Sequence, residues 1–396
     1  MRFKGFEDEW KLRKLNDLAD KVNSGKTPLG GEAVYSSNGI PFIRSQNVTN
    51  DQLKLENPVF IPEVVNAQMK NSVVKADDIL LNITGASLGR SCVVPKDFEM
   101  GNVNQHVCII RLNNQADPRF VQPVFSSDKG QSIFNSLQTG SGREGLNFES
   151  IKGIKLYIPE CLEQKKIASF LALLNSRIQT QSKIIRELSV LKGILIKKLF
   201  LEKVRFKNEK GKDFQGWKDF TLGDIGDVKM CKRIFNEETS PLGEVPFFKI
   251  GSFGKEADAF ISRSQYIDYK KRFSYPDKGD ILISAAGTIG RIVIYKGEEA
   301  YYQDSNIVWI NNDNTLISNS FLFYILQTVK YNTEGGTIQR LYNSILKLTK
   351  FRSPTLIEQN KISNFLSKID SKIEVEKELL LKYENQKKYL LQNLFI

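Results

Sequence analysis

One pattern occurs twice along this chain, and that duplication restricts the possible folds more than any other feature of the sequence. Both copies begin with a tryptophan, reach a short apolar run after a glycine, and continue to an Asp-Ile-Leu run that ends in a glycine-bearing turn. The matching stretches are residues 9–18 (EWKLRKLNDL) and 216–225 (GWKDFTLGDI), 39–44 (GIPFIR) and 243–249 (GEVPFFK), and 78–90 (DILLNITGASLGR) and 280–291 (DILISAAGTIGR). Their common order predicts two units built on one scaffold.

The strongest match lies at the end of each copy, where residues 163–171 (EQKKIASFL) parallel residues 358–366 (EQNKISNFL). Between such landmarks the copies diverge, for instance in residues 50–68 against 255–269, as expected if one scaffold carries two different surfaces. A length of 396 residues also suits two domains. We therefore expect four regions, namely globular units at 1–160 and 206–356 and helical regions at 161–205 and 357–396.

Each helical region has apolar residues in alternating steps of four and three, a spacing that predicts a long amphipathic helix with a heptad seam. Polar residues interrupt the seam at matching positions, Gln181 and Lys192 in the first copy and Glu376 and Lys387 in the second. Each helix should contain roughly 35 to 40 residues and span ~50–60 Å. The apolar seam positions are Ile167, Leu171, Leu174, Ile178, Ile185, Leu188, Leu195 and Leu199, then Ile362, Leu366, Ile369, Ile373, Leu380, Tyr383, Leu390 and Leu394.

A single helix of this kind would leave its apolar stripe in water, so each one needs a partner. Pairing the two copies as an antiparallel coiled coil would place the globular units at opposite ends, related by approximate two-fold symmetry. The alternative is two ordinary surface helices that each pack on their own unit, and the length of the periodic runs argues against it.

Short apolar runs that end in polar or glycine-bearing turns predict buried strands in both units. They cover residues 41–44, 78–82 and 103–112 in the first unit and 246–250, 280–284 and 305–311 in the second. With the two long helices, these strands predict an α+β fold.

The charge balance favours a polyanionic partner. Lysine and arginine number 57 against 45 aspartates and glutamates, a formal net charge of +12. Such a surface gains free energy by releasing the counterions condensed on nucleic acid. The alternative is that a lysine-rich solvated surface is basic without binding any polyanion.

Other features lead us to expect a cytoplasmic protein. Residues 1–10 carry acids where a signal peptide would carry an apolar run, and no stretch reaches the roughly 18 apolar residues of a membrane span. Cys92, Cys108, Cys161 and Cys231 lie far apart and form no CxxC pair, so no metal site or disulfide is proposed.

Candidate DNA-binding residues lie at the ends of the predicted strands. The loops at 85–90 and 287–291 can bring backbone N–H groups close to a phosphate, although a tight turn between strands explains them equally well. The other candidates are side chains able to make paired hydrogen bonds to bases or to clamp phosphates. The set is Arg44, Gln46, Asn47, Thr84, Gly85, Arg90, Gln105 and Arg143 in the first unit, and Lys249, Gly287, Arg291, Gln303, Asn306 and Arg340 in the second.

With its tandem units, its paired Gly-x-x-Gly loops and its duplicated Glu-Gln-x-x-Ile-x-x-Phe-Leu helix starts, the chain resembles the specificity subunits of type I restriction-modification systems over essentially its whole length. The resemblance implies two target recognition domains that each read one half of a split double-stranded DNA site. It also implies helices that act as a ruler and bind two methyltransferase subunits, and restriction (translocase) subunits that join the complex. S-adenosylmethionine, Mg²⁺ and ATP would then belong to the partners. The loop at 85–89 departs from the family pattern by one extra residue.

No catalytic motif accompanies this pattern. The (Asn/Asp)-Pro-Pro-(Tyr/Phe) motif of an adenine methyltransferase is missing, and residues 57–60 and 117–120 lack its second proline. Pro276-Asp277 begins no nuclease motif and is expected to be the turn before a strand. His106, the sole histidine, is expected to be structural or to face DNA. Because these catalytic motifs are missing, we expect a non-catalytic subunit. A stand-alone, non-specific DNA-binding protein or a catalytic methyltransferase or nuclease are the alternatives.

Overall fold

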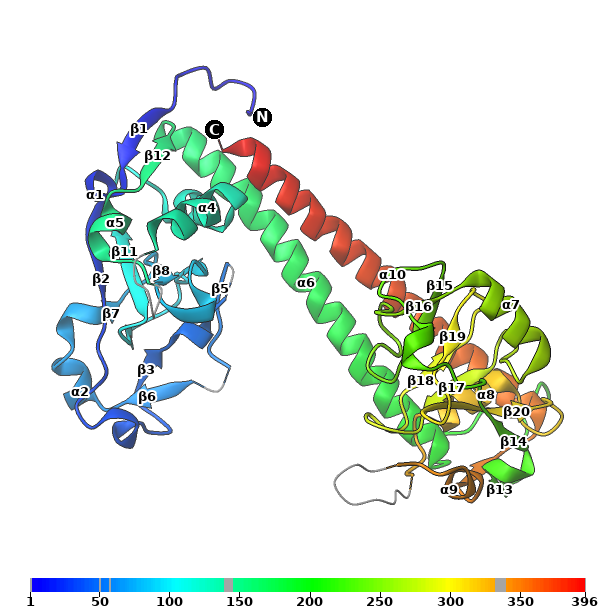
Figure 1. Cartoon of the computed structure of the whole chain (residues 1–396). Helices are drawn as coiled ribbons and strands as arrows, with labels where there is room; N and C mark the ends of the chain where they lie inside the picture. Colours follow the sequence, from blue (N-terminus) through cyan, green and yellow to red (C-terminus); the bar gives the residue numbers. More distant parts are fainter. Residues whose placement is uncertain (1, 50, 57, 139–144, 332–339, 396) are drawn as a thin grey trace. The chain divides into compact units, whose positions relative to one another are not determined.

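The computed structural model of this chain describes residues 2–49, 51–56, 58–138, 145–331 and 340–395 (Figure 1). It contains two compact units. Unit 1 comprises Met1–Ile184 and Glu376–Ile396, and unit 2 comprises Ile185–Val375. The division falls inside two long helices, α6 (Cys161–Phe200) and α10 (Leu356–Leu394), so each unit contains a part of both. Strands and helices mix in both units, which confirms the predicted α+β class.

Unit 1 is built on two four-stranded sheets. One has the order β2-β11-β8-β9 with antiparallel neighbours, and the other has the order β6-β3-β10-β7 with a parallel pair between β3 and β10. Their strands are β2 (Ala19–Ser24), β3 (Ile40–Ile43), β6 (Val59–Ile61), β7 (Val73–Val74), β8 (Ile79–Asn82), β9 (Ser91–Val93), β10 (Gly101–Val103) and β11 (Val107–Leu112). The pairs β1 (Lys11–Lys14) with β12 (Lys155–Ile158) and β4 (Val48–Thr49) with β5 (Gln52–Leu53) complete the unit, together with α1 (Leu15–Leu18), α2 (Glu63–Ala67), α3 (Pro118–Ser126), α4 (Asp128–Leu137) and α5 (Phe148–Lys152).

Unit 2 repeats this plan with fewer elements. Its four-stranded sheet has the order β14-β20-β17-β18 with antiparallel neighbours, and its second sheet, β16-β15-β19, keeps the parallel pair. The strands are β14 (Gly226–Lys229), β15 (Val245–Phe248), β16 (Phe260–Ile261), β17 (Ile281–Ser284), β18 (Ile292–Ile294), β19 (Tyr301–Tyr302) and β20 (Ile307–Asn312), with β13 (Lys218–Thr221) paired to β21 (Lys350–Ser353). Its shorter helices are α7 (Arg263–Arg272), α8 (Asn319–Ile325) and α9 (Asn343–Lys347).

The predicted strands agree with those observed except at residues 103–112. That run is broken, because β10 ends at Val103 and β11 begins at Val107. Asn104 ends the first strand by donating its backbone N–H to Ile43, and the side chain of Asn104 then accepts the N–H of His106. The run therefore feeds two different sheets. The turn predicted at Pro276–Asp280 is present before β17.

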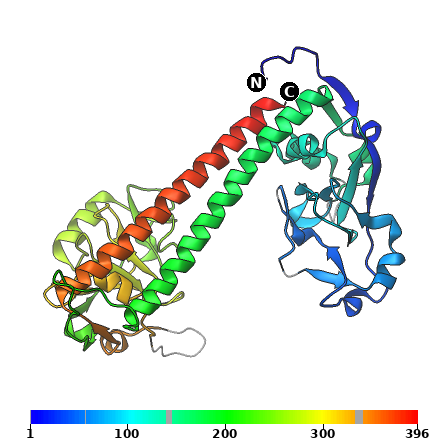
Figure 2. The ribbon, with the colours of Figure 1, turned by 180° about the vertical axis from the view of Figure 1, so that it is seen from behind.

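The long helices begin where the repeat predicted them and contain 40 and 39 residues. In unit 1 the start of α6 and the end of α10 share one apolar core with α3, α4 and β12, which includes Ile167, Leu171 and Leu174 on one helix and Leu390 and Leu394 on the other. Figures 1 and 2, seen from opposite sides, show these two segments next to each other. The side chain of Gln181 donates to the Glu376 carboxylate and to its backbone oxygen.

In unit 2 the other halves of the helices pack together in the same manner. Ile196 and Leu199 of α6 join Ile362 and Leu366 of α10 in one core, and Lys192 forms an ion pair with Asp370. Within each unit, the segments of α6 and α10 that pack together are antiparallel. The remaining seam positions are buried or half-buried, namely Ile178, Ile185, Leu188, Leu195, Ile369, Ile373, Leu380 and Tyr383. A continuous coiled coil stays a prediction.

An ion pair between an arginine and a buried glutamate, beside two packed phenylalanines, occurs at the start of each long helix, and the sequence analysis did not predict it. In unit 1 the guanidinium of Arg2 bonds both carboxylate oxygens of the fully buried Glu163, at 2.8 and 2.7 Å, and Phe3 meets Phe170 edge to face. Arg205 bonds Glu358 in the same way in unit 2, and Phe206 meets Phe365. The signal was visible in the sequence as Arg-Phe-Lys at 2–4 and 205–207.

Within the described residues, none of the helices combines the length and the apolar character that a membrane span needs.

Candidate nucleic-acid interface

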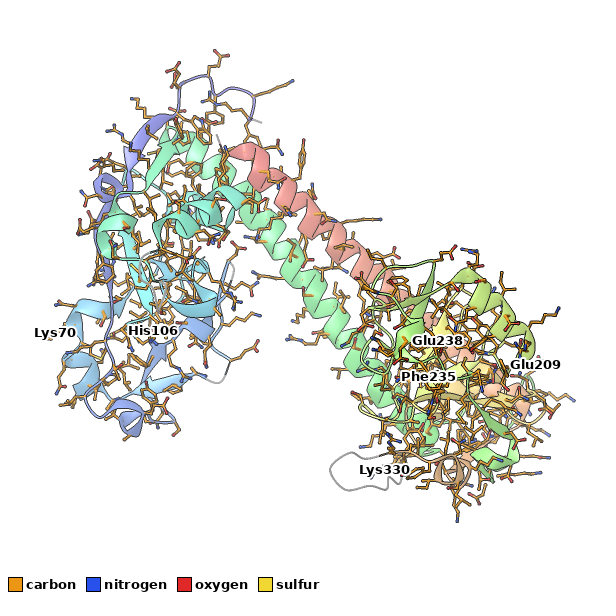
Figure 3. The ribbon with its side chains drawn as sticks, in the orientation of Figure 1. Lys70, His106, Glu209, Phe235, Glu238 and Lys330 are labelled. Carbon is orange, nitrogen blue, oxygen red and sulfur yellow. The ribbon has the colours of Figure 1, made fainter. Side chains whose placement is uncertain are left out.

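A chain of polar side chains lies where the strands of unit 1 end. Thr84 follows β8, and its hydroxyl lies 2.7 Å from Nδ1 of His106, whose Nε2 lies 3.1 Å from the amide nitrogen of Gln105. The Gln105 oxygen in turn accepts the hydroxyl of Thr27 at 2.9 Å. Figure 3 labels His106 within unit 1. The backbone N–H of Ile83 donates to the backbone oxygen of His106 and holds these strand ends together. Two predicted candidates, Thr84 and Gln105, therefore lie in one cluster.

The two glycine-bearing loops have closely similar geometry. Gly85 and Gly89 have φ values of 71° and 84°, and Gly287 and Gly290 have values of 64° and 80°, which only glycine adopts readily. The extra residue of the first loop does not change how the loop closes, because Gly89 donates to Asn82 and Gly290 to Ser284, both at 2.9 Å. Each loop joins two antiparallel strands, β8 to β9 and β17 to β18.

Only the first glycine of each loop is open to a ligand. A Cβ atom on Gly85 would meet nothing within 4 Å, and Gly287 would make only an ordinary contact at 3.5 Å. The second glycine is packed, because a Cβ on Gly89 would lie 2.6 Å from Gln131 and one on Gly290 would lie 2.8 Å from the ring of Tyr331. Gly85 and Gly287 are exposed and can approach a phosphate, whereas Gly89 and Gly290 serve packing.

The three candidates after β3 are an exposed one, Gln46, a half-buried one, Arg44, and a buried one, Asn47. Gln46 is exposed, and the guanidinium of Arg44 lies 6.0 Å from the ring centre of Tyr35. Burial raises the pKa of Tyr35, and the charge of Arg44 partly opposes that rise. Asn47 is only 5% exposed, and its side chain accepts the N–H of Arg44 and donates to the backbone oxygen of Lys54. Asn47 therefore fixes the loop, and this engagement argues against a direct base contact.

Unit 2 places its candidates at the matching strand ends. The Gln303 side-chain oxygen accepts the N–H of Ile250 at 2.9 Å, which leaves its amide N–H₂ group directed elsewhere. Lys249 is half-buried and lies 3.5 Å from an Asp258 carboxylate oxygen. Asn306 occupies the His106 position, because its backbone oxygen accepts the N–H of Ala285 as His106 accepts that of Ile83.

The arginines differ in their availability. Arg90 is exposed, whereas Arg291 is half-buried and donates to the backbone oxygen of Phe253 at 2.8 Å. Arg340 is exposed and its backbone forms a bridge with Ala286, next to the second glycine-bearing loop. Arg143 lies outside the described residues, but Gly145 bridges Thr84 in the same way in unit 1. None of these positions tests the predicted DNA contacts, which stay a prediction.

Unit 2 also contains a cluster of one lysine and three tyrosines that the sequence analysis did not select. The ammonium group of Lys270, on α7, lies 5.4 Å from the ring centre of Tyr266 and 4.8 Å from that of Tyr275. The Tyr275 hydroxyl donates to the backbone oxygen of Ala300 and contacts the hydroxyl of Tyr295. Burial is the first cause that raises the pKa of Tyr295, and Lys270 opposes it. The run of three consecutive basic residues at the end of α7, Lys270, Lys271 and Arg272, was the sequence signal that could have identified this cluster.

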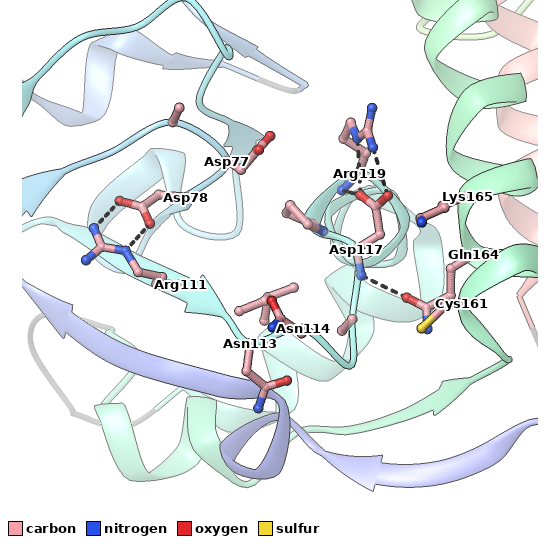
Figure 4. Close-up of a pocket in the computed structure, with 14 residues that line it drawn as sticks. Asp77, Asp78, Arg111, Asn113, Asn114, Asp117, Arg119, Cys161, Gln164 and Lys165 are labelled. Carbon is pink, nitrogen blue, oxygen red and sulfur yellow. Dashed lines mark hydrogen bonds and ion pairs between the residues drawn. The ribbon is translucent and has the colours of Figure 1, made fainter.

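A polar cavity of about 300 Å³ in unit 1 shows how charges are used away from the strand ends (Figure 4). Two of its three lining aspartates form ion pairs, since Asp78 bonds Arg111 at 2.7 Å and Asp117 bonds Arg119 at 2.9 Å. The backbone N–H of Asp117 donates to Gln164 of α6. The contacts that line the cavity therefore fasten the start of α3 to α6 and β11 to the segment before β8. No group of three His, Cys, Asp or Glu side chains suited to a metal ion occurs within the described parts of the chain.

Comparison with known proteins agrees with this architecture. Residues 7–190 and 215–385 each match the family described as "Type I restriction modification DNA specificity domain". A putative type I restriction enzyme specificity subunit of Haemophilus influenzae is 33% identical over 371 residues, which cover 93% of this chain and 89% of that protein. A putative type I restriction enzyme MjaX specificity subunit of Methanocaldococcus jannaschii is 23% identical over 97% of this chain and 92% of that protein.

Solved structures share the fold. The crystal structure of a type I restriction-modification S subunit from M. genitalium superposes with a TM-score of 0.62 at 16% identity, covering 100% of this chain and 99% of that one. A chain from a structure of an assembled type I R-M system gives 0.53 at 16% identity, with 98% of both chains covered. The two matched segments together span most of the sequence and coincide with its two repeats, so the chain belongs to the type I restriction modification DNA specificity domain family.

Proposed function

We propose that this chain is the DNA-sequence-reading subunit of a type I restriction-modification enzyme and that each unit reads one half of a bipartite site in double-stranded DNA. The observation that carries the proposal is one strand frame with two different polar edges. Thr84 and His106 of unit 1 correspond to Ala286 and Asn306 of unit 2 at the same backbone positions. Two such edges would present different hydrogen-bonding groups to the major groove and so select different bases.

Catalysis would reside in partner subunits. Two methyltransferase subunits carrying S-adenosylmethionine would methylate adenine at N6, and restriction subunits using ATP and Mg²⁺ would cleave unmodified DNA. The family match and the assembled R-M structure among the similar folds support this assignment. The basic composition, with a net charge of +12, favours binding to the DNA backbone around each half-site.

The test is a long-read methylome of a methylation-free host. One strain expresses this chain with its neighbouring methyltransferase, and the control strain expresses the methyltransferase alone. We expect N6-methyladenine in a split motif only when this chain is present, with a spacer of fixed length. The absence of new methylation would contradict the proposal and favour a stand-alone DNA-binding protein, which should bind duplexes of any sequence with similar affinity.

A further inference from the structure

An aspartate in unit 1 joins four elements at one point. Asp51 lies between β4 and β5, and its carboxylate accepts the amide of Gln122 at 2.9 Å, the hydroxyl of Ser126 at 3.1 Å and the ammonium group of Lys387. Its backbone N–H donates to Ser91 of β9 at 2.9 Å. The β4–β5 hairpin is thereby tied to β9, to α3 and to the long helix α10.

The pair between Asp51 and Lys387 is largely removed from water. Their side chains are 11% and 17% exposed, so the interaction is little screened and costly to break on one side. Asp51 also has a φ of 66°, a left-handed conformation that a non-glycine residue keeps only when its surroundings hold it there. The contacts of its carboxylate are what hold it.

The hairpin is directly connected to two candidate base readers. Arg44 and Gln46 precede β4, and Asn47 closes this segment by bonding both Arg44 and the backbone of Lys54, just beyond β5. A shift of the hairpin is therefore passed on to Arg44 and Gln46. Base recognition in the groove depends on the placement of such side chains, and one mismatched base pair typically costs ~1–3 kcal/mol.

The matching lysine in the other helix has a different partner. Lys192 occupies in α6 the seam position that Lys387 occupies in α10. Its ammonium group pairs with Asp370 of α10 at 2.5 Å and lies 5.6 Å from the ring centre of Tyr324. Lys192 thus contacts the frame of unit 2, whereas Lys387 contacts a segment within 50–68, where the two units diverge.

We propose that Lys387 is a positioning residue for DNA recognition by unit 1: through Asp51 it holds the β4–β5 hairpin, and with it Arg44 and Gln46, in the orientation that reads one half-site. This inference rests on the proposed function. In this proposal Lys387, a residue of α10, affects the sequence preference of unit 1 and leaves that of unit 2 unchanged.

The experiment uses the complex of the full chain with its methyltransferase. The half-site read by unit 1 is first assigned with a chain whose residues 1–160 come from another family member. Binding is then measured by competition between the cognate duplex and duplexes with one base pair changed in either half-site. For Lys387→Met we expect the preference for the cognate duplex over half-site 1 mismatches to fall about tenfold. The preference over half-site 2 mismatches should stay within about twofold.

Three further variants separate positioning from folding. Asp51→Asn combined with Lys387→Met leaves no buried charge without a partner, so this chain should fold and still lose half-site 1 discrimination. Lys387→Arg keeps the charge and should retain discrimination, and Lys192→Met, the matched control, should leave half-site 1 discrimination unchanged. Unchanged half-site 1 discrimination in the double variant, or an equal loss at both half-sites, would overturn the inference. A wild-type complex that discriminates at neither half-site would instead contradict the proposed function.

Discussion

Unit 1 and unit 2 close the same strand edge with different chemistry. In unit 1 the edge is a hydrogen-bonded row from Thr27 through Gln105 and His106 to Thr84. At the matching edge of unit 2, Arg233 forms an ion pair with Asp304 at 2.8 Å. The four-stranded sheets beneath both edges have the same strand order, and β8 pairs with β11 in the register in which β17 pairs with β20. The frame and the surface it presents can therefore change independently.

The elements that cover the glycine-bearing loops differ in the same sense. Phe134 and Gln131 of α4 cover Gly89 in unit 1, whereas Tyr331 covers Gly290 in unit 2. The requirement for a glycine is kept although the covering residue and its element have changed. Close packing at this point therefore requires a glycine in the loop, whereas the residue that packs against the glycine can vary.

The largest contrast between the units should appear at two matching aspartates. Asp78 bonds Arg111 with both carboxylate oxygens, but Asn311 takes the place of Arg111 in unit 2, where burial is the first cause that raises the pKa of Asp280. We expect Asp78→Asn to lower the free energy of unfolding of unit 1 by roughly 3 kcal/mol, because it leaves a partly buried arginine without a charged partner. Asp280→Asn should change unit 2 by less than about 1 kcal/mol at neutral pH.

Hydrogen exchange of peptides from β8 and β17 measures the two effects separately. The pH dependence gives a second check. Because the pKa of Asp280 is raised in the folded state, its contribution to stability is present below the ordinary value of 3.8 and is lost as the pH rises through the raised value. Asp280→Asn should remove this dependence from unit 2. Equal losses for both variants at neutral pH would contradict the contrast.

The next effect concerns the glycines of the second loop. Gly290→Ala combines a left-handed backbone with a Cβ placed 2.8 Å from the Tyr331 ring, so we expect a loss of about 2 kcal/mol in unfolding free energy. Gly287→Ala has the strained backbone but only an ordinary contact, and should lose about 1 kcal/mol. Chemical denaturation of the two variants compares them directly.

Gly89→Ala provides the matched control in unit 1. The nearest atom to its Cβ would be the amide oxygen of Gln131, which must shift although the amide nitrogen donates to the backbone oxygens of Gly89 and Phe125. Its loss should fall between those of Gly287→Ala and Gly290→Ala. A larger loss at Gly287 than at Gly290 would show that the covering tyrosine does not constrain the loop.

The smallest effect should be confined to recognition. His106→Asn places in unit 1 the residue found at the matching position of unit 2, and it breaks the row between Gln105 and Thr84. The stability should change little because His106 is only half-buried. Discrimination at the half-site of unit 1 should change by about 1 kcal/mol per lost contact, measured by competition binding. An equal change at both half-sites would argue against separate reading by the two units.

The frame of this protein could be predicted from sequence, whereas its long-range links could not. Periodicity is a local signal, so the repeat, the starts of the long helices and several strands could be read directly, and the seam positions proved to be buried or half-buried. The break at Asn104 depends on a backbone bond to Ile43 in another strand, which no local pattern reveals. Asn47 looked like a base reader because its residue type permits that role, yet its neighbours in space engage it. The pair of Asp51 and Lys387 joins residues 336 positions apart.

The contact between Gln181 and Glu376 has one more consequence. These two residues hold the same position in the two repeats, so this contact joins a residue to its own counterpart in the other repeat. Identical residues there would make that contact self-complementary. An amide beside a carboxylate is complementary only as an unlike pair, and two α10 helices meeting in this register would press two buried carboxylates together. The mismatch between the repeats therefore favours the pairing of α10 with α6 over a pairing of α10 with a second α10 at this position.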